Sequence, residues 1–183
     1  MRHLRAPKFL GNAGSALRWA IKNVGNIKDY VEEMNEEQPG LGDEFYGRRA
    51  EAYSDFSKEA YNDGQVVIYR AIQVPAINGV PQISWSNLGK SWSRTTAGVG
   101  VYGIIPYGQV PLREVLLQGI VKPKDIDWEF GFASFMYYGE DQWEVSMLPN
   151  APVQVTHVDY DELPEPALGD TGPAQEIWRP VEA

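Results

Sequence analysis

The stretch Asp63-Gly64-Gln65-Val66-Val67-Ile68-Tyr69-Arg70-Ala71-Ile72 divides the chain into two parts with different periodicity. Before it, apolar residues recur three to four positions apart, as in amphipathic helices. Residues 65–72 are instead rich in β-branched and aromatic side chains, which is typical of a strand. Helices followed by short strands predict an α+β fold, with a helical N-terminal third and a mainly antiparallel sheet.

The helical part is predicted to contain three helices. They cover residues 15–24, with Ser15 as N-cap, then 27–37, and then 43–62 after the breakers at positions 39–42. In the third helix, two sets of residues are expected on different faces. Phe45, Arg49, Tyr53, Phe56 and Ala60 recur at helical spacing, and Glu51, Asp55 and Glu59 line another face.

The strands predicted after Gly64 cover residues 65–72, 87–94, 113–121, 142–148 and 153–158. Residues 75–81 are predicted to form a loop, and residues 95–108 a short helical turn followed by a loop. The aromatic residues 128–138 fit either a short helix or a loop. Gly89 predicts a bulge or a close approach of the backbone.

Composition limits the function classes. The length of 183 residues fits one domain, predicted over residues 13–159. This domain is predicted to be helical over 13–63 and sheet-rich over 64–159. Residues 1–12 are predicted to form a flexible arm, and residues 160–183 an acidic, proline-containing tail. There is no cysteine and there are two histidines, so thiolate chemistry and a histidine metal site are not expected. No apolar run reaches the length of a membrane span, and we expect no signal peptide and a cytoplasmic protein, or one delivered into a host cell.

Charge is unevenly distributed along the chain. The net charge is −9, yet residues 1–28 carry six basic side chains and no acidic one. An acidic body argues against broad binding to a phosphate backbone, which needs a basic face.

Three polar motifs interrupt the predicted strands. Arg70 interrupts an apolar strand. It is either a structural cation, facing outward or paired with a carboxylate of the protein, or a clamp for an anionic ligand. Ser91-Trp92-Ser93 fits simple alternation with Trp92 inward, or two hydroxyls lining a cleft. Gln142 and Glu144 are predicted to share one strand face, opposite to Trp143, and that face is either solvated or part of a cleft.

In this order, the three motifs resemble those of the ADP-ribosyltransferase family, in its Arg-Ser-Glu branch of clostridial exoenzyme-like toxins, arginine-modifying transferases and phage enzymes. The resemblance covers residues 65–158 and rests on Tyr69-Arg70, on Ser91-Trp92-Ser93 and on Gln142-Trp143-Glu144 followed by an apolar run. It implies that family's split antiparallel sheet, with the three motifs converging on one cleft. Trp92 departs from the family's small middle residue, and Gln142 stands where many members have Glu.

The resemblance also implies an activity and residue roles. NAD would be the co-substrate, cleaved at the nicotinamide–ribose bond, and no metal is implied. Arg70 would hold the phosphates or ribose, with Tyr69, Ser93 and Trp92 also at the NAD site. Ser91 would orient Glu144, and Glu144 would stabilise the developing positive charge. Gln142 would orient the acceptor, assisted by a loop formed by Tyr137, Tyr138, Glu140 and Asp141.

The acceptor predicted by this resemblance is a protein, ahead of a nucleic acid. Because Gln142 has no titratable group, it favours an acceptor side chain other than arginine, unless Glu140 or Asp141 replaces the missing carboxylate. Two alternatives stay open: an NAD glycohydrolase that uses water as acceptor, and a non-catalytic binding or virion-associated module of the same fold.

Overall fold

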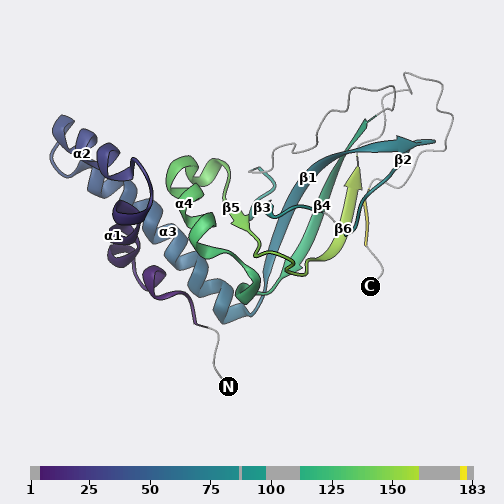
Figure 1. Cartoon of the computed structure of the whole chain (residues 1–183), viewed down its shortest axis with the longest axis horizontal. Helices are drawn as coiled ribbons and strands as arrows, with labels where there is room; N and C mark the ends of the chain where they lie inside the picture. The colour runs from purple at the N-terminus through teal and green to yellow at the C-terminus, as the bar shows by residue number, and fades with distance from the viewer. Residues whose placement is uncertain (1–4, 87, 98–111, 161–177, 181–183) are drawn as a thin grey trace.

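The computed structural model describes residues 5–86, 88–97, 112–160 and 178–180. It shows a helical N-terminal third next to an antiparallel sheet, which confirms the predicted α+β class (Figure 1). The elements are η1 (Lys8–Leu10), α1 (Ala13–Asn23), α2 (Ile27–Glu37), α3 (Leu41–Asp63), β1 (Val66–Ile77), β2 (Val80–Pro81), β3 (Ser91–Ser93), β4 (Leu112–Val121), η2 (Pro123–Asp125), α4 (Trp128–Tyr138), η3 (Gly139–Asp141), β5 (Glu144–Ser146), β6 (Gln154–Tyr160) and β7 (Trp178–Pro180).

The first helix begins two residues earlier than predicted, because Asn12 and not Ser15 is its N-cap. The Asn12 side chain accepts a hydrogen bond from the backbone N–H of Ser15, and the Ser15 hydroxyl accepts one from the backbone N–H of Asn12. This reciprocal capping box satisfies two amides that the helix itself leaves unpaired.

Helix α3 is the longest helix and joins the other helices to the sheet. Tyr53, Phe56 and Ala60 are buried, whereas Phe45, which follows the same helical spacing, is 40% exposed. Gly64, with φ of 75°, ends the helix in the left-handed region that glycine adopts without strain. The chain enters β1 two residues later, as the change in periodicity predicts.

The described strands form one antiparallel sheet in the order β5-β3-β1-β4-β6-β7, with β2 paired to β1. The longest pairing joins β1 and β4 from Val66↔Val121 to Pro75↔Leu112 without a register shift. Helix α4 packs next to β5, so the helical part meets the sheet at the β5 edge (Figure 1).

Several predicted boundaries are corrected. Strand β1 continues through residues 75–77 and turns at Asn78-Gly79 into β2, so the predicted loop over 75–81 is wrong. The aromatic residues 128–138 form a helix, and the strands predicted over 87–94 and 142–148 shorten to three residues each. Most of the predicted turn and loop over 95–108, and most of the predicted tail over 160–183, lie outside the described residues; Trp178–Pro180 pair with β6 as β7.

Aromatic rings fill the junction between helices and sheet. The Tyr53 ring contacts the rings of Phe132 and Phe135 at centroid distances of 5.4 and 5.2 Å, and Phe135 contacts Trp143 at 4.3 Å. These rings come from α3, α4 and the residue before β5, so the core holds the start of β5 against two helices. Among the described residues, no helix is both long and apolar enough to cross a bilayer.

Candidate functional site

The strands that carry the three polar motifs are neighbours in the sheet, because β3 pairs with β1 on one side and with β5 on the other. The pairing Tyr69↔Ser93 continues to Ser93↔Glu144, so these three residues form one row across the sheet. Directly opposed residues of an antiparallel pair project to the same face. Tyr69, Ser93 and Glu144 therefore lie on one face, next to one another.

Ser93 and Glu144 are paired at close range. The flanking amides of Arg94 and Met147 donate to the carbonyls of Trp143 and Lys90 at 2.9 and 2.8 Å. These bonds make the Ser93–Glu144 pair a non-hydrogen-bonded one, in which side chains approach most closely. Ser93 thus occupies the position next to Glu144 that was predicted for Ser91. The register pairs Ser91 with Ser146 instead, so that prediction is corrected.

The Glu144 carboxylate is held by helix α4. The Ser134 hydroxyl donates a hydrogen bond to Glu144 Oε2, and the hydroxyl of the buried Tyr53 donates to the Glu144 carbonyl at 3.2 Å. Burial, with a smaller contribution from Glu144, raises the pKa of Tyr53 far above its usual value, so this hydroxyl stays a donor. Glu144 remains half-buried, so its carboxylate is fixed in place but not sealed in the core.

Backbone geometry just before Glu144 corrects the predicted strand. Gln142 has helical dihedral angles and Trp143 has a φ of 41°, so β5 begins only at Glu144. Gln142 and Glu144 therefore do not share a strand face. The Ser93 hydroxyl stabilises this bend, because it donates to the Gln142 carbonyl at 2.7 Å and accepts from the Thr95 amide at 3.1 Å.

Arg70 lies on the other face of the sheet. Because Tyr69 shares a face with Glu144, strand alternation directs Arg70 to the opposite face, where its register partner is the buried Leu117. Its guanidinium donates to the Ser91 carbonyl and lies against Gly89, where a Cβ would be 2.6 Å from Nη2. Gly89 thus makes the close approach that the sequence predicts, but Arg70 and Glu144 do not converge on one face, and that expectation is corrected.

Trp92 lies on the same side as Arg70. It is 2% exposed, and its indole N–H donates to the Gly89 carbonyl at 3.0 Å. The predicted inward position of Trp92 is therefore confirmed, and its ring does not face Glu144. Simple alternation also places Ser93 toward solvent, and that part is wrong because Ser93 is 3% exposed.

A cavity of about 370 Å³ opens beside this row, next to Tyr69. Its lining includes Arg94, whose guanidinium lies 4.4 Å from the Phe56 ring centroid and 4.9 Å from that of Trp143. Arg94 also pairs with Glu59 at 2.9 Å, and that carboxylate is mostly exposed. The Arg94 guanidinium can bind an anion in this cavity when the Glu59 carboxylate releases it.

The predicted acceptor loop follows α4. Tyr137 and Tyr138 end the helix with exposed rings, and Glu140 and Asp141 lie in the exposed η3 turn that leads to Gln142. The structure therefore places these four residues together at the surface, a few positions before Glu144.

Two residues of this site were not predicted as parts of it. Arg94 directly follows the second motif, and its charge next to that motif was an available signal. Ser134 lies ten positions before Glu144 on another element, and no local pattern links the two.

Among the described residues, no cluster of histidine, aspartate and glutamate has the geometry of a metal site. Comparisons of the chain with protein-family models, with curated proteins and with solved structures found no match.

Proposed function

We propose that this chain is an ADP-ribosyltransferase that cleaves NAD between nicotinamide and ribose and transfers ADP-ribose to a protein. The observation that carries the proposal is the row Tyr69–Ser93–Glu144, which brings one residue of each motif side by side on adjacent strands and leaves Glu144 half-buried. A cavity opens at the Tyr69 end of this row. The motif order and the family resemblance add support.

In the proposed reaction, the bond between the ribose carbon and the nicotinamide nitrogen breaks, and its electron pair leaves with neutral nicotinamide. The ribose develops oxocarbenium character, which a nearby carboxylate stabilises electrostatically. The acceptor nucleophile then bonds to the same carbon and loses its proton. Glu144 supplies the carboxylate, and its hydrogen bond from Ser134 orients it before the reaction.

Two other residues act by positioning. Ser93 holds the bend at positions 142–143 and thereby the start of β5. Arg70 holds the Ser91 carbonyl from the far face, so phosphate binding by Arg70 is not part of the proposal. Arg94 is the cation that lines the cavity beside Tyr69, and we assign the contact with the NAD phosphates to it.

The test is incubation of the purified protein with labelled NAD and a cell lysate, in wild type and in Glu144→Gln. We expect labelled protein from the wild type and a loss of about a hundredfold or more in the variant, which keeps the shape but removes the charge. Free ADP-ribose as the sole product would support the glycohydrolase alternative, and no turnover would support the non-catalytic module.

The same reaction products identify the acceptor. Because Gln142 cannot serve as a second carboxylate, we expect mass spectrometry to find ADP-ribose on side chains other than arginine. ADP-ribose mainly on arginine would contradict this expectation and assign the missing role to Glu140 or Asp141.

A further inference from the structure

Four partly exposed aromatic side chains gather where α2, α3 and the end of α4 meet. Tyr30 is 38%, Phe45 40%, Tyr137 38% and Tyr138 57% exposed. Single exposed aromatic residues are common, but a contiguous group of them marks an interaction surface. We call these four residues the aromatic surface.

The three tyrosine rings of this surface contact one another, and Arg49 connects them to Phe45. Tyr137 lies edge-on to Tyr30 at 6.4 Å and contacts Tyr138 at 6.4 Å. Arg49 stacks on Phe45 at 4.6 Å and donates to the carbonyls of Met136 and Tyr137 at 2.6 and 3.2 Å. Arg49 thus ties α3 to the end of α4, so a partner would meet a preformed surface and little ordering entropy would be lost.

Carboxylates surround the aromatic surface. Tyr30 borders a groove of about 490 Å³ on α2 that is also lined by Asn26, Asp29, Glu32, Glu33 and Glu36. Glu140 and Asp141 are exposed and follow Tyr138 closely in the chain. Two nearby cations are paired with carboxylates: Lys28 with Glu32 at 3.8 Å, and Arg48 with Glu44. Arg49, which stacks on Phe45, donates to backbone carbonyls of α4. The surface is therefore aromatic and acidic.

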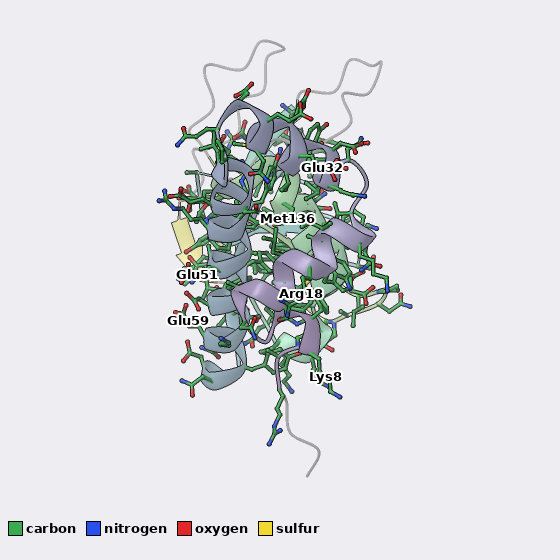
Figure 2. All side chains as sticks on the ribbon, turned by 90° about the vertical axis from the view of Figure 1, so that its left-hand side faces the viewer. Lys8, Arg18, Glu32, Glu51, Glu59 and Met136 are labelled. Atoms are coloured by element: carbon green, nitrogen blue, oxygen red, sulfur yellow. The ribbon has the colours of Figure 1, made fainter. Side chains whose placement is uncertain are left out.

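Lys8 of η1 lies away from the acidic groove on α2 (Figure 2). Figure 2 shows Glu32 at one end of the helical layer and Lys8 at the other. An anionic partner such as a nucleic acid would be repelled from the aromatic surface, whereas a cationic one would be attracted to it.

We infer that the aromatic surface and its carboxylates dock an arginine- and lysine-rich segment of a partner protein. The guanidinium or ammonium groups would stack on the faces of Tyr30 and Tyr138 and pair with the carboxylates of α2 and η3. The inference stands on this surface alone. Within the proposed function, the docked protein is the ADP-ribose acceptor, because the surface leads directly into the residues before Glu144.

The probe for this inference is a fluorescein-labelled peptide of alternating arginine and glycine, titrated with the protein in the absence of NAD. We expect wild type to bind it and not to bind the glutamate–glycine counterpart, and we expect affinity to fall as salt is raised from about 50 to 500 mM. Each of Tyr30→Ala and Tyr138→Ala should weaken binding about two- to fivefold, the size of one exposed cation–π contact.

Two charge reversals distinguish binding at the aromatic surface from attraction by the net negative charge of the whole protein. Glu33→Lys adds a cation at the groove, and Glu51→Lys makes the same change in net charge on the outer face of α3, where Glu51 lies apart from Glu32 (Figure 2). We expect at least a fivefold loss for the first and less than twofold for the second. Equal losses, or no binding by folded wild type, would overturn the inference. Glu144→Gln should bind the peptide like wild type, so failure of the proposed chemistry is distinguished from failure of this surface.

Discussion

Gly131 lies where helix α4 packs against the strand that carries Glu144. A Cβ at this position would lie 2.5 Å from the Tyr53 hydroxyl, 3.2 Å from the Glu144 carbonyl oxygen and 3.6 Å from the Ser146 amide. The Tyr53 side chain is fully buried, and the other two atoms belong to the backbone of β5. None of these atoms can move away easily, so we predict that Gly131→Ala pushes α4 off β5.

The free energy of unfolding should reflect two opposing effects. Alanine in place of glycine in a helix stabilises by about 1 kcal/mol. Overpacking of a filled core costs about 1–3 kcal/mol, and a contact at 2.5 Å with a fixed atom belongs at the upper end of this range. The net expectation is a loss of about 2 kcal/mol, or a decrease in Tm of about 4–8 °C for a chain of this length.

Thermal and denaturant unfolding of Gly131→Ala can be compared with Gly47→Ala as a matched control. Gly47 also lies within a helix, but a Cβ there would meet nothing within 4 Å, so this variant should gain up to about 1 kcal/mol. Tyr53→Phe removes the closest atom, so the double variant Tyr53→Phe/Gly131→Ala should lose about 1 kcal/mol less than the sum of the single variants. Equal stability of the two alanine variants, or strict additivity in the double variant, would refute this reasoning.

Three further predictions concern pH and the proposed site. Burial raises the pKa of Tyr53 above its unfolded value of 10.0, so the neutral side chain contributes stability that is complete below about pH 10 and is lost above it. The Tm of the wild type should therefore fall as the pH rises past about 10. The decrease should be smaller in Tyr53→Phe. Ser134→Ala should lower kcat for NAD cleavage about tenfold or more, with little change in KM. Ser134→Thr should restore kcat, because its hydroxyl can again donate a hydrogen bond to Glu144. Equal kcat in the two variants would count against the role of Ser134. Arg94→Gln should raise KM for NAD about tenfold. Glu59→Gln breaks the same ion pair but keeps the cation, so it should leave KM unchanged. Equal effects of the two variants on KM would mean that the ion pair acts only in folding.

Much of the fold was predictable because it rests on local patterns. The change of period at Gly64 separates helices from strands, and the helix over residues 27–37 and the strand over 113–121 match the structure within one residue. These elements repeat their apolar pattern over at least nine residues, so the signal is strong. The start of α1 was mispredicted because Asn12 and Ser15 are both residues that favour the N-cap, and Asn12 takes that position with Ser15 as its capping-box partner.

The candidate site was predictable only in part. The sequence shows that one arginine, one serine pair and one glutamate interrupt predicted strands. It did not determine which serine faces Glu144, since a strand shows period two but not its register with a neighbour. The pairing of β1, β3 and β5 places Ser93 opposite Glu144. The same pairing places Arg70 on the face of the sheet opposite to Glu144.

Only the tertiary structure brought Ser134, Tyr53 and Gly131 to Glu144. Their contacts depend on how closely α4 packs against the edge of β5, and that distance is set by the aromatic core beneath them. The sequence determines which side chains can donate, accept or stack, because these are properties of single residues. Packing between distant segments decides which of them meet, since that depends on the shapes of all the elements together.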